Sequence, residues 1–310
     1  MNRVGRSAWV AALDSPTARR ITGSRAATRV LGSGAFEAVD NQRRRLRARL
    51  HTLRDPHRFD DVESLCVFIG HVKSGGTMLG SLLDAHPHAL VSDEVDLLHQ
   101  MTRGFSRAEL FHLIERSSQR EADKGRITAR RLEPYSFAVP GLAQGQAESV
   151  RVLGDVRGGP TTRRAGEQPE LLDRLAATVA PTPLRYIHAI RDPFDPISAT
   201  MVRGGRTPAN AIDDYEQQCH RLVRLRAHVG SDALLTVRYE QFVAAPVLGL
   251  ERVCRHVGLD APTDYLDGCA AIIDAGRPGE RHMVEWKSAD IDRVHDLIER
   301  FDFLEGYRWV

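Results

Sequence analysis

The sequence predicts an α/β fold, a P-loop-like three-layer fold with a mainly parallel central sheet flanked by helices. Short apolar runs of strand length recur along the chain. Stretches with helical spacing of their apolar residues lie between these runs, and polar or glycine-containing loops follow the runs. Strands that alternate with helices are typical of a parallel sheet with helices on its faces.

The strand-like runs are 66–70, 150–156, 186–190 and 234–242. The helical stretches are 41–55, parts of 95–135, 169–181, 208–229, 248–259 and 289–309. Gly158, Gly159 and Pro160 are expected to break the chain after the second strand, and the segment from 264 to 286 is expected to be a loop.

Composition describes an ordinary soluble globular protein of 310 residues, with 42% hydrophobic and 27% charged residues. The net charge of +2 suggests no nucleic-acid partner. Residues 1–60 carry 13 Arg and 5 acidic residues, about +8, which leaves about −6 for the rest. We therefore expect a basic, mostly helical N-terminal extension over 1–60 and one domain over 61–310. No apolar run is long enough to span a membrane, and the expected location is cytoplasmic.

The four cysteines lack regular spacing, and they are expected to be reduced core residues rather than disulfide or zinc ligands. Of the 43 basic residues only three are lysines, Lys73, Lys124 and Lys287. A lysine in a glycine-containing loop is therefore unusual for this chain. Its compact ammonium suits a leaving oxygen on which charge develops.

The segment HVKSGGT at 71–77 follows the first strand and precedes a helical stretch. Loop amides and the positive end of the helix would converge on a phosphate or sulfate. Gly75 and Gly76 allow close backbone approach, Lys73 adds a charge, and Ser74 and Thr77 add hydroxyls. The pattern is weak evidence when it stands alone.

Arg191 follows the strand at 186–190. Ligands of parallel α/β sheets bind at the carboxyl ends of the strands, so the loops at Lys73 and Arg191 are expected on one edge. A structural pairing of Arg191 with Asp192 or Asp195 is the alternative.

The ordered motifs VKSGGT, LDAHP, SDEVD, IRDPFDPIS, LLTVRYEQF, RHMVEW and DFLEGY extend from the anion loop to the end of the chain. Together they resemble the sulfotransferases that use 3′-phosphoadenosine 5′-phosphosulfate (PAPS), most closely the bacterial branch and the tyrosylprotein-type enzymes. The resemblance covers roughly residues 62–310 and leaves the first sixty outside. It implies a P-loop-like fold and transfer of a sulfuryl group from PAPS, which leaves as adenosine 3′,5′-bisphosphate. The acceptor would be a hydroxyl of a small molecule, glycan or peptide.

The resemblance also implies roles for individual residues. Lys73 would contact the bridging oxygen, and the 5′-phosphate would lie on Ser74, Gly75, Gly76, Thr77 and Met78. Arg191 and Ser198 would bind the 3′-phosphate, although Ser198 stands seven residues after Arg191 where many members have eight. Tyr239 would lie near the adenosine. Arg281, Trp286 and Lys287 would lie in the late segment that closes over the nucleotide, a looser correspondence than the others, and Arg277 belongs to the same loop.

Glu94 stands seven residues after Pro87, where the tyrosylprotein-type enzymes have a catalytic glutamate. It would act as the general base, with Lys73 stabilising the leaving group. Asp93 and Asp96 compete for this role, and the cytosolic members of the family use a histidine. Without the family, Tyr239 and Trp286 are most simply core aromatics.

The sequence is compared with two other functions, a kinase and a non-enzymatic binding module. An ATP-dependent P-loop kinase would need GxxxxGK[ST], whereas Lys73 precedes the glycine pair here. A non-enzymatic module could bind a nucleotide or an acidic partner through the basic N-terminal segment. No metal is expected, and Asp155 is the closest candidate for a magnesium ligand. The sequence identifies neither the acceptor nor the oligomeric state.

Overall fold

The structure is a computed structural model that describes residues 34–127, 136–274 and 279–309. It divides into two units, Met1–Arg54 and Asp55–Val310. In the described part of the first unit the chain forms α4 (Gly34–Arg54), an arginine-rich helix. The sequence predicted a boundary near residue 60, and the division in the structure falls after Arg54. The part of the predicted N-terminal extension over 1–33 lies outside the described residues.

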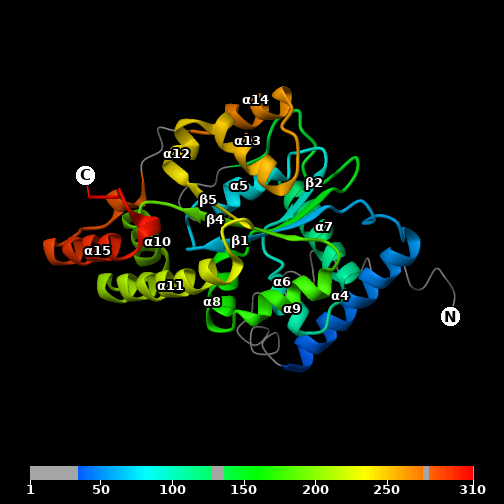
Figure 1. The fold of residues 1–310 in the computed structure, drawn as a ribbon, viewed down its shortest axis with the longest axis horizontal. Helices are drawn as coiled ribbons and strands as arrows, with labels where there is room; N and C mark the ends of the chain where they lie inside the picture. The colour runs from blue at the N-terminus through cyan, green and yellow to red at the C-terminus, as the bar shows by residue number, and fades with distance from the viewer. Residues whose placement is uncertain (1–33, 128–135, 275–278, 310) are drawn as a thin grey trace, which may run out of the picture. The chain divides into compact units, whose positions relative to one another are not determined.

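The second unit contains a five-stranded sheet (Figure 1). Its strands are β1 (Ser64–Gly70), β2 (Ala89–Ser92), β3 (Val152–Asp155), β4 (Leu184–Ile190) and β5 (Leu234–Arg238). They lie in the order β2-β3-β1-β4-β5, and every neighbouring pair is parallel. The parallel sheet confirms the predicted fold class. All five carboxyl ends therefore lie at one edge of the sheet.

The helices of this unit are α5 (Gly76–Leu83), α6 (Leu97–Thr102), α7 (Arg107–Asp123), α8 (Gly158–Glu167), α9 (Glu170–Val179), α10 (Phe194–Gly204), α11 (Pro208–Val229), α12 (Tyr239–Ala244), α13 (Pro246–Val257), α14 (Thr263–Ala271) and α15 (Ser288–Arg300). Two 3-10 turns, η1 (Glu280–Met283) and η2 (Asp302–Leu304), flank α15.

Strand β1 shows why the fold has three layers. Its side chains alternate between faces. Leu65, Val67 and Ile69 belong to one hydrophobic core, whereas Cys66 and Phe68 belong to the other. Buried residues of α6, α8, α9 and α11 fill the first core, and those of α5, α13 and α14 fill the second. Figure 1 shows these two groups of helices on opposite sides of the sheet.

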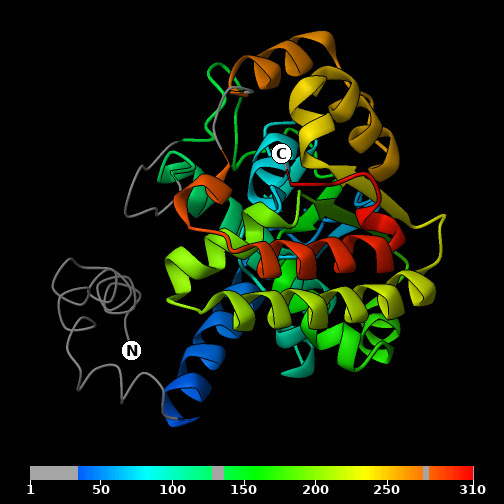
Figure 2. The same cartoon turned by 90° about the vertical axis from the view of Figure 1, so that its left-hand side faces the viewer.

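Helix α15 lies along α11, as Figure 2 shows. Arg293 pairs with Asp213 at 2.7 Å, and Arg300 pairs with Glu216 at 2.7 Å. These pairs join the two helices at their surfaces.

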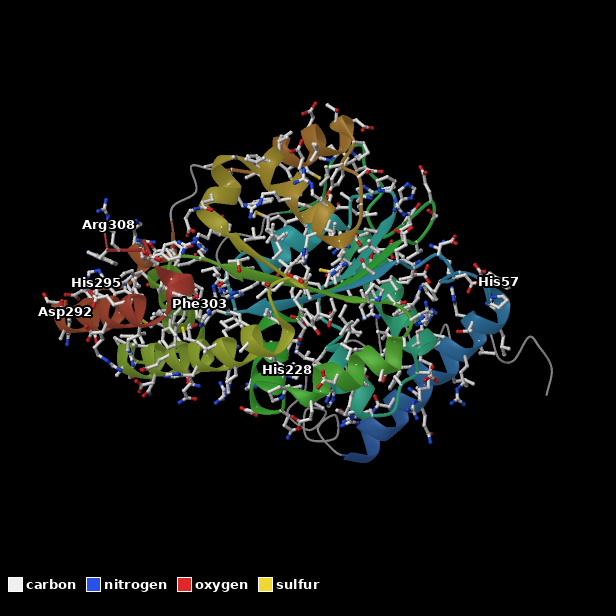
Figure 3. The ribbon with its side chains drawn as sticks, viewed as in Figure 1. His57, His228, Asp292, His295, Phe303 and Arg308 are labelled. Atoms are coloured by element: carbon white, nitrogen blue, oxygen red, sulfur yellow. The ribbon has the colours of Figure 1, made fainter. Side chains whose placement is uncertain are left out.

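The segment after α15 returns to the sheet and to α10. The amide of Trp309 donates to Nε2 of His295 at 3.2 Å, and the Trp309 ring lies 4.9 Å from the ring of Phe194 on α10. Phe303 packs against the buried His188 of β4, with 5.3 Å between ring centroids. Figure 3 labels His295 and Phe303 in this region. The chain end thereby supports the first turn of α10, which follows Arg191.

Three elements differ from the sequence prediction near the carboxyl end. Strand β5 ends at Arg238, and Tyr239 opens α12 instead of continuing the strand to 242. The predicted loop from 264 contains α14, whose buried Tyr265, Leu266 and Cys269 pack in the second core. The last helix ends at Arg300 rather than at 309, because the chain turns there so that Phe301, Phe303 and Leu304 are buried.

Strand β2, helix α8 and helix α10 were not predicted. Strand β2 has four residues, too short for a periodicity signal, and is completely buried. Helix α8 begins at Gly158, where glycines and a proline indicated a break. A proline is tolerated in the first turn of a helix, where the amide has no intrahelical acceptor.

The carboxylate of Asp84 organises the chain between α5 and β2. It pairs with the buried Arg126 and accepts hydrogen bonds from the Ser118 hydroxyl, the Val91 amide (2.6 Å) and the Gly145 amide (2.8 Å). Since each partner comes from a different segment, this cluster fixes the start of β2 relative to α7.

The predicted state of the cysteines is confirmed. Cys66, Cys219, Cys254 and Cys269 are buried free thiols, and burial raises the pKa of each. Among the described helices, none combines the length and apolar character needed to cross a bilayer.

Candidate active site

The candidate site lies along the carboxyl edge of the sheet. The loop with Lys73 follows β1, and Arg191 follows the neighbouring strand β4. Glu94 follows β2, and Tyr239 follows β5. The fold thus brings to one edge residues that lie up to 166 positions apart in the sequence, from Lys73 to Tyr239. The predicted common edge for the loops at Lys73 and Arg191 is confirmed.

The loop after β1 has the backbone of an anion site. Lys73 has φ 68° and Gly75 has φ 91°, so both residues adopt the left-handed region. Such turns expose successive amides to one side and form nests for anions. Gly75 caps α5 without a side-chain hydrogen bond, which leaves the first amides of the helix for a ligand.

Tyr239 connects this loop with the one after β4. A Cβ added to Gly75 would lie 2.7 Å from Cδ2 of Tyr239, so glycine is required by space as well as by φ. The guanidinium carbon of Arg191 lies 4.7 Å from the centroid of the same ring. The Tyr239 ring therefore lies between the two predicted anion sites. It contacts residues of both loops and does not only fill the core.

The other predicted loop residues differ in exposure. Lys73 and Thr77 are exposed, Ser74 is buried at 3%, and Gly76 begins α5. Met78 is a core residue of α5, packed in the second core. The side chain of Met78 is therefore occupied in the core, and only its backbone amide is suited to contact a ligand.

Asp155 holds the acidic loop after β2. Its carboxylate accepts from the Ser92 hydroxyl (2.8 Å) and from the amides of Val95 (3.0 Å) and Leu97 (3.1 Å). Burial raises its pKa to about 6 despite these three donors. The residue considered as a magnesium ligand thus uses both oxygens to fix the segment that carries Asp93 and Glu94.

The three acidic residues of this loop have different environments. Glu94 is 71% exposed in its side chain and pairs with Arg157 at 2.8 Å. Asp93 is partly buried, and burial and then Glu94 raise its pKa, whereas a hydrogen bond with Thr77 acts in the other direction. Asp96 is buried and caps α6 by accepting from the His99 amide at 3.2 Å. Asp96 therefore has a structural task, while Asp93 and Glu94 face the edge where acid–base chemistry could occur.

Arg191 is enclosed by acidic side chains. Its Nη2 lies 3.1 Å from Asp195 and its Nη1 lies 2.9 Å from Glu280. Burial opposes its charge, but Asp195 and Glu280 outweigh that effect, and the pKa of the guanidinium is raised. The alternative considered from the sequence, a structural ion pair between Arg191 and Asp195, is therefore present. Its Nε is buried without a hydrogen-bond partner and remains a donor for a ligand.

The late segment contacts the same region. Arg281 pairs with Asp192 (2.7 Å) and Asp195 (3.2 Å), and the indole of Trp286 donates to the Ser198 hydroxyl at 3.2 Å. Ser198 is completely buried. Lys287 is exposed and precedes α15, and Arg277 lies outside the described residues. Arg191, predicted to bind the 3′-phosphate, and Arg281, predicted to lie in the segment over the nucleotide, thus share the carboxylate of Asp195. Ser198, the other predicted 3′-phosphate residue, is joined to the same late segment through Trp286.

Sequence reasoning missed three charged residues of this edge: Arg157, Arg203 and Glu280. Arg157 follows β3 in the way that Arg191 follows β4, so the rule that located Arg191 could have found it. Arg203 lies at the end of α10 and pairs with Glu280 at 3.0 Å. No spacing signal links Glu280 to Arg203 across 77 positions.

His71 is the histidine nearest to the loop in sequence. It stacks on Tyr215 with 3.8 Å between centroids, and its Nε2 lies 3.2 Å from the Tyr215 carbonyl. Burial lowers its pKa to about 4, so it is neutral near pH 7. It belongs to the packing between β1 and α11.

A parallel α/β sheet with a glycine-containing loop after its central strand and arginines along the same edge is an arrangement in which α/β proteins bind phosphorylated ligands. Comparison with known families identifies the family of the chain. Residues 67–263 match the model of the sulfotransferase family. The chain belongs to this family and is an enzyme that transfers sulfate.

Solved structures with similar folds include three sulfotransferases. The sulfotransferase domain of the Synechococcus PCC 7002 olefin synthase is 19% identical, with 77% of this chain and 94% of that domain covered and a TM-score of 0.47. Sulfotransferase STF9 from Mycobacterium avium is 12% identical, with coverage of 88% and 86% and a TM-score of 0.47. Mouse sulfotransferase SULT7A1, complexed with PAP, is 13% identical, with coverage of 77% and 84% and a TM-score of 0.41. A search of curated proteins finds no match.

Proposed function

We propose that the enzyme transfers a sulfuryl group from PAPS to a hydroxyl of a small-molecule, glycan or peptide acceptor. The observation that carries the proposal is the pairing of two anion sites on adjacent parallel strands, with Tyr239 between them. One site follows β1 and suits a 5′-phosphosulfate, and the other follows β4 and suits a 3′-phosphate. A donor with phosphates at both ends of a nucleoside needs two such sites.

The residues present fit this donor. The left-handed backbone at Lys73 and Gly75 turns loop amides toward one side, and the first amides of α5 lack a side-chain cap. At the other end, the buried Nε of Arg191 has no partner. Lys73, Ser74, Gly75, Gly76, Thr77 and the backbone of Met78 would hold the 5′ end. Arg191, Ser198 and Arg281 would hold the 3′ end, and Tyr239 would lie beside the adenosine.

Bound PAPS supplies an activated sulfuryl group and a 3′,5′-bisphosphate leaving group. Glu94 would accept the proton of the acceptor hydroxyl as its oxygen bonds to sulfur. Lys73 would stabilise the negative charge that develops on the bridging oxygen as the sulfur–oxygen bond breaks. Arg157 holds Glu94 through their ion pair, and Asp155 holds the loop that carries it. The proton thus moves to Glu94 and the electron pair to the 5′-phosphate.

Thermal-shift titration of the full chain distinguishes this donor from the nucleotide of a kinase. Adenosine 3′,5′-bisphosphate is expected to raise the melting temperature, because a ligand that binds the folded state stabilises it. ATP with magnesium is expected to shift it less. Arg191→Ala should remove most of the bisphosphate shift, whereas Arg174→Ala, an exposed arginine of α9, should leave it unchanged. Stabilisation by ATP with magnesium alone would refute the proposal.

A further inference from the structure

Glu280 lies where an anion is expected. Its Oε2 accepts from Nη1 of Arg191 at 2.9 Å, and its Oε1 accepts from Nη2 of Arg203 at 3.0 Å. The residue is only 8% exposed. A carboxylate shared by two guanidinium groups makes the same charge-assisted hydrogen bonds that a phosphate makes with arginines. Glu280 therefore uses donors that the proposed 3′-phosphate site needs.

Carboxylates already compensate the charge of Arg191 and its neighbouring arginines. Within the described residues, ion pairs join three arginines with three carboxylates, namely Arg191, Arg203 and Arg281 with Asp192, Asp195 and Glu280. A phosphate monoester carries about −1.5 to −2 at pH 7. Its addition to this cluster, most of which is withdrawn from water, would leave excess negative charge at low dielectric. One carboxylate has to leave before the phosphate gains the full attraction of the arginines.

Glu280 is the carboxylate best placed to leave. Asp192 and Asp195 belong to the turn that opens α10, where the Phe194 amide donates to Asp192 at 3.2 Å. Glu280 instead belongs to η1, a 3-10 turn of four residues. A short 3-10 turn rearranges at lower cost than the start of an 11-residue helix packed in the core.

Access to Ser198 leads to the same conclusion. Its hydroxyl is completely buried, and it accepts the indole hydrogen bond of Trp286. Trp286 follows Glu280 by six residues in the same segment. While this segment holds its present position, both predicted ligands of the 3′-phosphate are engaged by it.

We infer that Glu280 is an internal counter-ion that the 3′-phosphate of the donor displaces from Arg191 and Arg203, so that this residue sets the affinity for PAPS. The inference rests on the proposed function and adds to it a determinant of donor affinity. It makes Arg203 a further arginine for the 3′-phosphate, because displacement of Glu280 releases the guanidinium groups of Arg191 and Arg203. The cost of displacing Glu280 is subtracted from the binding free energy of any ligand with a 3′-phosphate.

Isothermal titration calorimetry of the full chain tests the inference with two ligands. Adenosine 3′,5′-bisphosphate carries the 3′-phosphate, and adenosine 5′-phosphate lacks it. Glu280→Gln keeps the shape of the side chain and removes its charge, and Glu280→Ala is a second variant. Glu285→Gln is the matched control, because Glu285 is exposed and belongs to the same segment. Melting temperatures without ligand verify that each variant is folded.

We expect both Glu280 variants to lower the Kd of the bisphosphate about tenfold and to leave the Kd of adenosine 5′-phosphate unchanged. Glu285→Gln should match the unaltered chain for both ligands. Bisphosphate binding that weakens or stays the same in both Glu280 variants overturns the inference, and it would show that Glu280 positions Arg191 instead. Preference of the unaltered chain for the bisphosphate over adenosine 5′-phosphate tests the proposed function separately, since it does not depend on Glu280.

Discussion

The two proposed anion sites of this enzyme are built in different ways. The site after β1 consists of left-handed backbone at Lys73 and Gly75 and of uncapped helix amides, with Lys73 exposed to solvent. The site after β4 consists of arginines among carboxylates, with Arg191 only 12% exposed in its side chain. Both lie on adjacent strands of one sheet edge.

The difference indicates different tasks for the two ends of the donor. Backbone amides are fixed by the fold and need no rearrangement to receive an anion. Buried guanidinium groups without a ligand need counter-ions, because an unpaired buried charge costs several kcal/mol. The site after β1 is therefore suited to the reacting group, whereas the site after β4 is suited to selection of a donor that can replace an internal carboxylate.

The largest expected effect concerns the acceptor side of the site. Glu94→Gln should lower turnover by about 10²- to 10⁴-fold, because a general base contributes about that factor. Affinity for adenosine 3′,5′-bisphosphate should change little. The measurement is release of the bisphosphate from PAPS in the presence of an accepted hydroxyl compound. Asp93→Asn is the comparison variant, and a larger loss for Asp93→Asn than for Glu94→Gln would make Asp93 the base.

Lys73→Ala tests the reacting end of the donor. We expect turnover to fall by about 10²- to 10³-fold, as it does when one stabilising donor is removed from a developing negative charge. The control is Lys124→Ala, since Lys124 is exposed and pairs with Glu121 on the same helix turn at 2.7 Å. Comparable rates for the two lysine variants would remove Lys73 from the mechanism.

Gly75→Ala tests whether the loop after β1 is preformed. The substitution combines a left-handed φ with a Cβ 2.7 Å from the Tyr239 ring. It should weaken bisphosphate binding by about tenfold or more, beyond the roughly 1–2 kcal/mol cost of the backbone conformation. Gly141→Ala has a similar φ of 82° and no atom within 4 Å, so it isolates the backbone cost. Equal bisphosphate affinity of the two variants would contradict the close packing of Gly75 on Tyr239.

The smallest expected effect concerns Asp155. Asp155→Asn places an NH₂ group in the carboxyl site and leaves one of three donors unsatisfied, so stability at pH 4 should fall by about 1–3 kcal/mol. The effect should depend on pH. Because the folded pKa of about 6 exceeds the unfolded value near 3.8, Asp155 contributes most below pH 4 and loses that contribution as pH rises to 6. Denaturant unfolding of both proteins from pH 4 to 7 should therefore show the larger difference at pH 4, and a larger difference at pH 7 would contradict this account.

The sequence predicted the sheet edge well because a few strong local signals define it. The runs before Lys73 and Arg191 are apolar and of strand length, and parallel pairing then places their loops together. Strand β2 was not predicted, because four residues are too few to show the alternation of polar and apolar side chains that indicates a strand. Helix α8 escaped because glycine and proline favour a turn in isolation, whereas here they open a helix that packs on β1 and α11.

The interior of the site could not be read from spacing. The contacts of Glu280 with Arg191 and Arg203 span 89 and 77 positions, and they depend on how η1 packs on α10. The task of Asp155 was also hidden, because a carboxylate at a strand end is equally typical of a metal ligand and of an acceptor for loop amides. Three-dimensional packing decides which of these two roles a carboxylate at a strand end has.

The central claim is that the site after β4 binds the 3′-phosphate of the donor, while the site after β1 binds its 5′-phosphosulfate. The most direct measurement is the Kd of adenosine 3′,5′-bisphosphate and of adenosine 5′-phosphate for the unaltered chain, Arg191→Ala and Lys73→Ala. We predict that Arg191→Ala removes most of the preference for the bisphosphate, whereas Lys73→Ala weakens the binding of both ligands by the same factor and keeps the preference. Retention of the full preference by Arg191→Ala would contradict the account.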